Sequence, residues 1–572
     1  MSDLPIRSYE TLPATFSPWD PRTVDVAAGL ARLLGSARHG TVVHHVGSSA
    51  VPGLPGKNVV DLAVEADPDA IPAITEAAVS LGFAPQDGIA FFGPARPLLR
   101  GTVIHEATPF RVHLHVMPPA RRELPELLGF RDALRADHAL RDAYAEAKRR
   151  IVEDAPDGDA NGLYTVRKSH FVEEALYRLR LRLPPADAPV PLAPGSTIGI
   201  LGGGQLGRML GFAARAMGYR IVALDPDPAC PTAAVADEIV VGRYDDADAA
   251  RRLGAMSDVV TYELEHVGLA AAEAAAAGAP LRPGLAALAA TQDRLAERRF
   301  IRSIGEWTAP WREVRGVAEA EAAADALGLP MRLKSPVGGY DGRSQVRVVS
   351  LEGIAAGAAA LGGLDGRPLL AEAEIDYEAE LSVVCARDRD GRVLAYPMSR
   401  NVHDAGVLAE SVAPAPVHPL VAHDARAIAD SVARGLDLVG VMTVELFQLR
   451  GGGLMINELA PRVHNSGHWT IEGAATSQFE QHLRAILGLP LGSVEPHGVA
   501  AMTNLLGTGM DRPARLAGLD AALADPGVHV HVYGKRRVFE RRKMGHVTVV
   551  GRDADEALAR ARRAHDALSW EG

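Results

Sequence analysis

Apolar residues recur at strand spacing in some stretches and at helical spacing in others, and the changes between them divide the chain. From Thr197 the chain reads strand, glycine turn, helix and strand in TIGIL, GGGQ, LGRMLGFAARAMGY and RIVALD. This alternation predicts parallel strands joined by right-handed crossover helices. An alanine-rich helical stretch follows from Leu269, and strand-rich sequence with turns fills about residues 330–460. The first 183 residues show a mixed pattern in their first half and a helical pattern in their second half, which contains ELLGFRDALRADHALRDAYAEAKRRIVED.

A proline-rich segment marks the clearest boundary in the chain. Residues 184–196, PPADAPVPLAPGS, hold five prolines among small residues and show no amphipathic period, which is typical of a stiff, solvated linker. A chain of 572 residues is long enough for about four folding units of about 150 residues each. We therefore predict a domain at residues 1–183, the linker at 184–196, and three further units at 197–291, 292–490 and 491–572.

Composition is typical of a globular protein and argues against several functional classes. The chain is 47% hydrophobic and 23% charged, and no run approaches the ~20 apolar residues that cross a bilayer. MSDLPIRSYE carries no basic segment followed by an apolar core, so we expect no secretion signal and a cytoplasmic location. The chain contains only two cysteines, Cys230 and Cys385, which suits a reducing compartment. The net charge of -11 argues against binding to nucleic acid or to a membrane surface.

A glycine loop follows the predicted strand at residues 197–201. Gly202, Gly204 and Gly207 match G-x-G-x-x-G between a strand and a helix, and Asp225 ends the next strand. Glycines there let the backbone approach a phosphate, and the N–H groups at the start of the helix face it. The loop alone is compatible with three hypotheses: the dinucleotide site of an NAD-dependent oxidoreductase, a site for another phosphate-bearing ligand, or a structural turn.

A lysine and a second glycine loop indicate a nucleoside triphosphate. LKSPVGGYDGRSQVRV places Lys334 at a strand end, followed by a loop that holds three glycines, Asp341 and Arg343. A point charge and a mobile loop of backbone donors suit the phosphates of a triphosphate, although the spacing is not that of a P-loop. The extended connector at residues 372–375 suits an adenine edge and Glu380 suits ribose hydroxyls. The alternative interpretation of that stretch is an ordinary acidic edge strand.

Two acidic residues are predicted to face each other across a hairpin. Glu445 lies in the strand VGVMTVELFQL and Glu458 in the strand GLMINELAPR, with a short turn between them. A hairpin that brings both carboxylates to one face is costly unless cations bridge them. Oxygen ligands with open positions for phosphate oxygens are typical of magnesium. We therefore predict a magnesium site at Glu445 and Glu458.

The segment NELAPRVHNSGHWT offers a competing metal site. His464 and His468 stand four residues apart, the spacing that on a helix directs two imidazoles to one zinc ion. Asn465, Ser466 and Gly467 lie between them, and a glycine-containing segment of this kind is a poor helix. We therefore favour the carboxylates of the preceding hairpin as metal ligands.

These motifs together resemble a known family. GILGGGQLGRML, VTYELEHV, QDRLAERRF, GGYDGRSQ, VELF, NELAPRVHNSGHWTIEGAATSQFEQHLRA and YGKRRVFERRKMGHV occur in this order over about residues 197–550. They resemble the N5-carboxyaminoimidazole ribonucleotide synthases, which are ATP-grasp ligases of purine biosynthesis. The resemblance implies a Rossmann-like N-lobe, a central ATP-grasp domain and a small C-terminal domain. It implies ATP-dependent carboxylation of aminoimidazole ribonucleotide with bicarbonate through carboxyphosphate, in a protein that is typically a homodimer.

The resemblance also assigns roles to individual residues. The implied ATP contacts are Arg294, Lys334, Gly339, Tyr340, Asp341, Gly342, Arg343, Ser344, Gln345, Glu372, Ala373, Glu374, Ile375, Glu380, His403 and Asn457. Glu445 and Glu458 are the implied ligands of magnesium, or of manganese in its place, with Glu458 also counted among the nucleotide contacts. The implied substrate contacts are Tyr340, Ser466, His468, Lys535 and Arg542. The implied catalytic residues are Asp341, Arg343, Arg462 and His468.

Several positions depart from the pattern of this family. Phe539 and Glu540 stand where arginine and proline are expected, Ser344 replaces a glycine, and His266 replaces an asparagine. These departures keep two alternatives open: an ATP-grasp ligase that acts on a different amine, and a nucleotide-binding regulatory protein.

The first 183 residues resemble a second family. HHVGSSAVPGLPGKNVVDLAVEA, FRVHLHVMPP and FRDALRADHALRDAYAEAK resemble GrpB-like proteins, which share the nucleotidyltransferase fold. Gly47, Ser48 and Asp61 suit the opening motif of that fold. Position 63 is alanine where a second carboxylate is normally needed for two-metal chemistry, and the later strand carries His113 and His115. Binding, regulation and a metal-dependent activity all remain open for this domain, and the histidines are equally compatible with ordinary strand positions.

Overall fold

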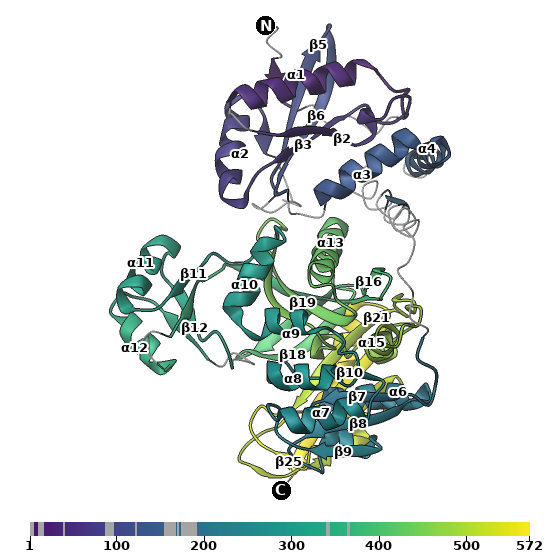
Figure 1. The fold of residues 1–572 in the computed structure, drawn as a ribbon, viewed down its shortest axis with the longest axis vertical. Coiled ribbons are helices and arrows are strands. Elements are labelled where there is room, and N and C mark those ends of the chain that lie inside the picture. Colours follow the sequence, from purple (N-terminus) through teal and green to yellow (C-terminus); the bar gives the residue numbers. More distant parts are fainter. Residues whose placement is uncertain are drawn as a thin grey trace.

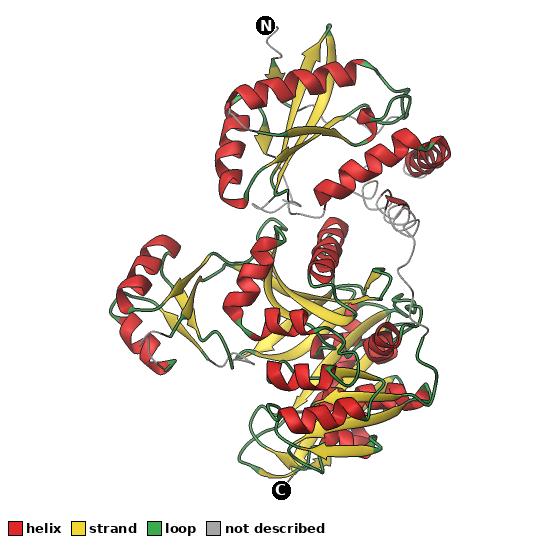
Figure 2. Ribbon diagram, viewed as in Figure 1, coloured by secondary structure: helices red, strands yellow, loops and turns green. Residues whose placement is uncertain are grey.

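The computed structural model describes residues 5–9, 16–37, 41–85, 96–119, 123–153, 168, 171–172, 175, 191–338, 344–362 and 367–571. Figure 1 shows a module formed by the first part of the chain and a larger body that begins at residue 191. Figure 2 shows that helices and strands are mixed in both. No helix in the described ranges is long and apolar enough to cross a membrane.

The N-terminal module is a sheet with helices on both faces. Within its described part, six strands pair in the order β1-β5-β6-β3-β2, with β4 on β5, and β3 and β6 are parallel. Apolar side chains of α1 and α2 pack on one face, and Leu124 of α3 packs on the other. The bounds are β1 (Ile6–Arg7), α1 (Arg22–Ala37), β2 (Val43–Val46), β3 (Val60–Glu65), α2 (Ile71–Ser80), β4 (Ala84–Pro85), β5 (Leu98–His105), β6 (Thr108–Met117), α3 (Glu123–Ala136) and α4 (His138–Glu153).

The predicted crossover unit is present and opens the larger body. Four strands of the fully described range 191–291 are parallel in the order β10-β7-β8-β9. Buried residues of α7 and α8 cover one face of this sheet, and α6 and α15 cover the other. The bounds are β7 (Thr197–Leu201), α6 (Gln205–Ala216), β8 (Arg220–Asp225), β9 (Glu238–Val241), α7 (Ala247–Ala255), β10 (Val259–Tyr262), α8 (Leu269–Ala276) and α9 (Leu285–Gln292).

A small lobe follows, and we use this name for residues 311–373. Its described strands are antiparallel in the order β11-β14-β12-β13. Alanine-rich faces of α11 and α12 pack against them. The bounds are β11 (Trp311–Val314), α11 (Val317–Leu327), β12 (Met331–Lys334), β13 (Gln345–Val348), α12 (Gly353–Ala360) and β14 (Leu369–Ala373).

One large sheet carries the rest of the chain. Nine strands of the described chain pair in the order β20-β19-β15-β17-β18-β21-β26-β24, with β16 on β15. Because β18 pairs with β21, the predicted units 292–490 and 491–572 share a single sheet. The strands are β15 (Tyr377–Arg387), β16 (Val393–Ala395), β17 (Ser399–Asp404), β18 (Val407–Ala413), β19 (Gly440–Leu449), β20 (Leu454–Ala460), β21 (Val499–Leu506), β24 (Val528–Val532) and β26 (Lys543–Gly551).

Helices cover this sheet on both sides. Side chains of α10 and α13 bury its central strands, and α17 covers its C-terminal end. The helices of this part are α10 (Arg294–Ser303), α13 (Pro419–Gly435), α14 (Thr470–Gly473), α15 (Gln478–Leu487), α16 (Leu519–Ala522) and α17 (Ala554–Asp566). Two small strand pairs complete the body, formed by β22 (Arg512–Pro513) with β25 (Arg537–Val538) and β23 (Arg515–Ala517) with β27 (Ser569–Glu571).

Candidate active site

A cavity of about 920 Å³ opens where the parallel sheet, the small lobe and the large sheet meet. It is lined at one end by side chains of the small lobe and at the other by the glycine loop and the C-terminal strands. Of the predicted site residues, the cavity wall includes Arg294, Lys334, Gln345, Glu372, Ala373, Glu374, Ile375, Glu380, His403, Glu445, Asn457, Glu458, Arg462 and Lys535. Residues separated by more than 200 positions in the sequence therefore line one continuous space.

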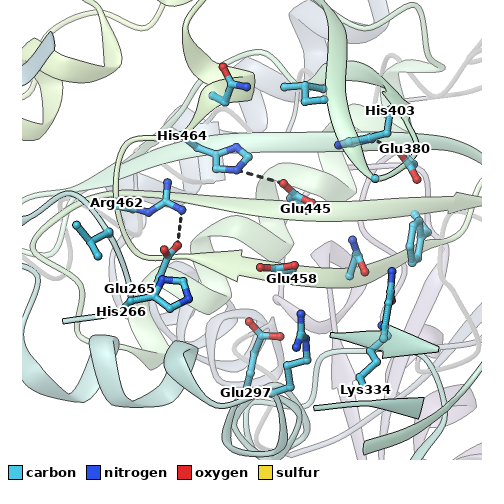
Figure 3. Close-up of a pocket in the computed structure, with 18 of the residues that line it drawn as sticks. Glu265, His266, Glu297, Lys334, Glu380, His403, Glu445, Glu458, Arg462 and His464 are labelled. Carbon is cyan, nitrogen blue, oxygen red and sulfur yellow. Dashed lines mark hydrogen bonds and ion pairs between the residues drawn. The ribbon is translucent and has the colours of Figure 1, made fainter. Parts of the chain in front are cut away.

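The predicted acidic pair is a direct cross-strand pair. Glu445 of β19 lies opposite Glu458 of β20 in the hairpin register, and both line the cavity (Figure 3). Burial, reinforced by the negative charge of Glu458, raises the pKa of Glu445 to about 7. The His464 Nε2 atom lies 3.3 Å from a Glu445 oxygen. Two carboxylates that face each other across the hairpin at the cavity wall are a fitting donor set for a divalent cation with oxygen preference.

Four charged side chains form a buried network beside this pair. Lys334 of β12 is ion-paired with Glu372 of β14, and Arg298 of α10 lies 2.8 Å from the same carboxylate. Arg298 also donates to its neighbour Glu297 over 2.6 Å. Burial raises the pKa of Glu372, but the charges of Arg298 and Lys334 outweigh burial and lower the pKa to about 2. The predicted phosphate lysine is therefore held in place by residues of two other elements.

The nucleotide end of the cavity has an aromatic wall. Tyr377 and Phe447 stack with ring centroids 4.5 Å apart, next to the connector at residues 372–375. The Tyr377 hydroxyl donates to Glu380 over 2.8 Å, and His403 is ion-paired with the other oxygen of that carboxylate. Burial lowers the pKa of His403, but the hydrogen bond to Glu380 outweighs it and raises the pKa. A flat apolar surface beside an anchored carboxylate suits a base and a ribose.

The opposite end of the cavity joins the parallel sheet to the C-terminal strands. Lys535 donates to the side chain of Gln205 over 2.6 Å and to the carbonyl of Lys543 over 2.6 Å. Arg462 lies between the two ends and forms an ion pair of 2.5 Å with Glu265 (Figure 3). The cavity therefore offers cations along its whole length, which suits a ligand with phosphate groups at both ends.

The glycine loop binds carboxylates of the protein itself. The N–H groups of Gly204 and Gly207 donate to Glu263, over 2.5 Å and 2.9 Å. Asp225 accepts from the N–H of Gly203 over 2.9 Å and from the Tyr244 hydroxyl over 2.8 Å. Because these groups are already bonded, they are not free to bind a pyrophosphate or a ribose. The dinucleotide hypothesis is wrong.

Three predicted substrate contacts lie outside the cavity wall. Ser466 is fully buried and hydrogen-bonds to Ser382 over 2.8 Å. His468 is also fully buried, its Nδ1 atom accepts from the Gln478 side-chain amide over 3.1 Å, and its ring packs against other aromatic rings. Both belong to a short 3-10 turn, Asn465–Gly467, and its C-terminal flank, so the turn directs them into the core behind the cavity. Arg542 donates to the carbonyl of Arg537 over 2.7 Å.

The remaining predicted contacts lie in the second glycine loop. Gly339, Tyr340, Asp341, Gly342 and Arg343 are outside the described residues. Ser344, which stands in place of a glycine, has a φ of 61° and is not part of the cavity wall. A positive φ strains any residue with a Cβ, so the structure explains why glycine suits this position.

Several wall residues were not predicted individually. Glu263 and Glu265 lie in the motif VTYELEHV, and Glu297 and Arg298 lie in QDRLAERRF. Most of their partners lie far away in the sequence, so the only signal in the sequence was a charged residue among apolar neighbours. Tyr377 lies in β15 and Phe447 in β19. Aromatic residues are common in strands, so neither stands out in the sequence.

The N-terminal module carries a separate polar cluster. Asp61 and His113 are register partners on the parallel strands β3 and β6, with 3.3 Å between a carboxylate oxygen and Nδ1. Gly47 has a φ of 70°, and a Cβ there would lie 2.4 Å from Asp61. Lys148 is buried beside this cluster and donates to the Pro55 carbonyl over 2.7 Å. Over the described ranges, no three histidine, cysteine, aspartate or glutamate side chains are grouped to hold a metal ion, so Asp61, His113 and His115 do not form such a site.

Models of protein families match four consecutive parts of the chain. These are GrpB protein at residues 13–178, ribonucleotide synthetase preATP-grasp domain at 196–292, ATP-grasp domain at 299–479, and phosphoribosylaminoimidazole carboxylase C-terminal domain at 500–560.

The larger body also resembles individual proteins over nearly their whole length. The N5-carboxyaminoimidazole ribonucleotide synthase of Brucella melitensis is 45% identical over 357 residues, which are 62% of this chain and 97% of that protein. The one of Bacillus subtilis is 39% identical over 363 residues, 64% of this chain and 93% of that protein. The chain belongs to the N5-carboxyaminoimidazole ribonucleotide synthase family.

A solved structure agrees with this membership. The N5-carboxyaminoimidazole synthase of Aspergillus clavatus, in complex with ADP and 5-aminoimidazole ribonucleotide, is 34% identical with a TM-score of 0.58. The match covers 65% of this chain and 98% of that one. The predicted ATP-grasp fold, with its preATP-grasp and C-terminal parts and a GrpB-like module before them, is confirmed.

Three departures from the family pattern now have a structural context. The Arg542 guanidinium lies over the ring of Phe539, 5.0 Å from its centroid. Glu540 accepts from the N–H of Gly509 over 2.7 Å, which ties the turn to a neighbouring loop. His266 lines the cavity. The substitutions at 539 and 540 therefore affect how the turn between β25 and β26 is held. His266 instead affects the shape of the cavity.

Proposed function

We propose that the chain catalyses ATP-dependent carboxylation of 5-aminoimidazole ribonucleotide with bicarbonate. The products are N5-carboxyaminoimidazole ribonucleotide, ADP and phosphate. The observation that carries the proposal is the single cavity that joins Lys334 and the Glu445–Glu458 pair to Lys535 and Gln205. A ligase of this kind must hold two phosphate-bearing substrates with their reacting groups in the same space.

The small-lobe end of the cavity binds ATP in this proposal. Lys334 contacts the phosphates, and Arg294 lies beside it. The Arg294 guanidinium donates to the Ser335 carbonyl over 2.7 Å. The connector at residues 372–375 receives the adenine edge, Tyr377 and Phe447 form its wall, and Glu380, held by His403, receives the ribose. The loop that contains Tyr340, Asp341 and Arg343 contributes further contacts, as the family resemblance implies.

Glu445 and Glu458, with the Asn457 side chain nearby, hold magnesium, or manganese in its place. Bound there, a divalent cation neutralises phosphate charge and orients the transferred phosphoryl group. The fit rests on the two opposed carboxylates and on the raised pKa of Glu445. The protein would supply few ligands here, which is typical of magnesium sites that also bind substrate phosphates.

The other end of the cavity binds aminoimidazole ribonucleotide. Lys535 contacts its phosphate, and Gln205 holds the lysine in position through the 2.6 Å hydrogen bond. A bicarbonate oxygen attacks the γ-phosphorus of ATP, which releases ADP and forms carboxyphosphate. The amine nitrogen then bonds to the carboxyl carbon and loses a proton, while the carbon–oxygen bond to the phosphoryl group breaks and phosphate leaves with that proton. Arg462 lies between the two ends, where it stabilises the anionic carboxyl group.

The deciding experiment is phosphate release from ATP by the full chain. We expect release that requires both bicarbonate and aminoimidazole ribonucleotide, with carboxylated product in equal amount. Release that needs bicarbonate and a different amine would indicate another substrate. ATP binding with no release under any combination would indicate a regulatory role and would overturn the proposal.

We also propose a homodimer in the cytoplasm. Members of the family are typically dimers, and the free, buried thiols of Cys230 and Cys385 suit a reducing compartment. Light scattering on the purified full chain measures the mass: twice the 60.4 kDa of the chain is expected, and a mass of one chain at micromolar concentration would contradict the dimer.

A further inference from the structure

The strand that carries Glu458 lies at the edge of its sheet. Among the described strands, β20 pairs only with β19, so the backbone groups on its outer side need other partners. The carbonyl of Asn457 and the N–H of Leu459 are such groups, and they flank Glu458 on either side.

Two neighbouring side chains of α10 bond to these groups. Glu297 accepts from the N–H of Leu459 over 2.9 Å, and Arg298 donates to the carbonyl of Asn457 over 2.9 Å. One acceptor and one donor thus pair with the edge as a further strand would. The position of Glu458 along and across the sheet is therefore set from both sides, by Glu445 opposite and by α10 behind.

The same arginine reaches the small lobe. Its Nε atom donates to Glu372 over 2.9 Å, and Glu372 is ion-paired with Lys334. The four side chains of this chain of contacts are each no more than 10% exposed. Only an arginine fork presents enough donors in fixed directions to bind one carbonyl and two carboxylates at once.

We infer that Glu297 and Arg298 are positioning residues for the ATP-dependent step. They fix the carboxylate of Glu458 relative to Lys334, so that the cation on Glu458 lies next to the phosphates on Lys334. They touch neither substrate in this role. The inference rests on the proposed function, because it assigns Glu458 to the cation and Lys334 to the phosphates.

The test compares three variants of the full chain. Arg298→Lys keeps a positive charge but loses the fork, and Glu297→Gln keeps an acceptor for Leu459 but loses the charge that pairs with Arg298. Arg299→Lys is the matched control, because Arg299 is the next residue of α10, is more than half exposed, and pairs with Glu313 at the surface.

Two readouts separate positioning from general damage. The first is the magnesium concentration that gives half-maximal turnover, together with kcat and the KM for aminoimidazole ribonucleotide. The second is the gain in ADP affinity on adding magnesium, measured by calorimetry. The second readout requires no carboxylation, so it tests the inference even if the wild-type chain shows no turnover with this amine.

For Arg298→Lys we expect kcat to fall by ~10²-fold, as for a misplaced reacting group. The half-maximal magnesium concentration should rise about tenfold, while the KM for aminoimidazole ribonucleotide stays within about twofold. Glu297→Gln should show the same pattern to a smaller extent. The ADP affinity gained with magnesium should shrink in both, and Arg299→Lys should match the wild type.

Magnesium dependence equal to that of Arg299→Lys, in both variants and by both readouts, would overturn the inference. A lower melting temperature with unchanged magnesium dependence would also overturn it, because the pair would then be merely structural. If Arg298→Lys does not fold, the nearly isosteric Glu297→Gln decides by the same criteria.

Discussion

Replacing Glu372 by glutamine tests the buried network that holds Lys334. Glu372 is 4% exposed and pairs with both Arg298 and Lys334. Its pKa is lowered from 4.5 to about 2, and each tenfold change in a protonation constant is worth about 1.4 kcal/mol. The ionised carboxylate therefore stabilises the fold by about 3 kcal/mol at pH 7. A similar size is expected from the general cost of removing one partner of a buried ion pair, which is about 3 to 5 kcal/mol.

The pH dependence of this stabilisation has a definite sign. Because the folded pKa lies below the unfolded value, the stabilisation is present above pH 4.5 and is lost as the pH falls towards 2. The difference between wild type and Glu372→Gln should therefore fall from about 3 kcal/mol at pH 7 to about 2 kcal/mol at about pH 3.5.

Urea unfolding of the full chain, followed by circular dichroism, measures the difference. Glu374→Gln is the control, because Glu374 lies on the same connector but is more exposed and pairs with Arg347 and Arg332 at the surface. We expect the control to change the unfolding free energy by less than about 1 kcal/mol. An effect of Glu372→Gln no larger than that of the control, or one that grows as the pH falls, would refute the reasoning.

Three further predictions concern the cation, the end of the cavity proposed for aminoimidazole ribonucleotide, and Ser344 of the second glycine loop. Glu458→Gln should lower turnover by ~10²-fold or more with an unchanged circular dichroism spectrum, because phosphoryl charge loses its cation ligand; near-normal turnover would contradict the assignment. Lys535→Ala should raise the KM for aminoimidazole ribonucleotide at least about tenfold and leave the KM for ATP within about twofold; equal changes in both would show that the lysine is misplaced. Ser344→Gly should raise the unfolding free energy by up to about 1 kcal/mol, because glycine adopts a φ of 61° without strain. Ser344→Val should lower it by about 1 to 2 kcal/mol, because this φ is strained for a side chain branched at Cβ. Equal stability of the two variants in urea would contradict the strain.

The parts of the fold that rest on local pattern were predictable. The strand, glycine turn and helix at residues 197–216 form β7 and α6, because period and turn residues agree there. The cross-strand pair of Glu445 and Glu458 was also predictable, because a short turn leaves a hairpin few registers. In contrast, the pairing of β18 with β21 joins strands that are far apart in sequence. Neither strand shows in its own residues which partner it takes, so the sequence alone does not reveal that residues 292–490 and 491–572 contribute strands to one sheet.

The candidate site was predictable where residues act from strands, and less so where they act from turns. Lys334, Glu372 and Glu380 lie within strands β12, β14 and β15, where alternation fixes the side that each side chain faces. Ser466 lies within a 3-10 turn and His468 directly follows it, and the direction of such a turn depends on what it packs against. Here Ser382, Gln478 and the aromatic rings behind the wall draw both side chains into the core. A polar motif thus includes residues that line the cavity, such as Arg462, and residues that support the wall from behind.

The glycine loop shows why a motif can specify a backbone without specifying a ligand. Gly204 and Gly207 present N–H groups at the start of α6 that have no partner within the helix, and any acceptor of suitable charge can bind such groups. The acceptor in this chain is Glu263, which follows β10 and lies 59 residues beyond Gly204. A carboxylate held in this way closes the dinucleotide site from within and anchors Glu263 in the cavity wall. What binds the loop is therefore decided by the residue that reaches it in space, whereas Lys334 and Lys535 line the two ends of the cavity.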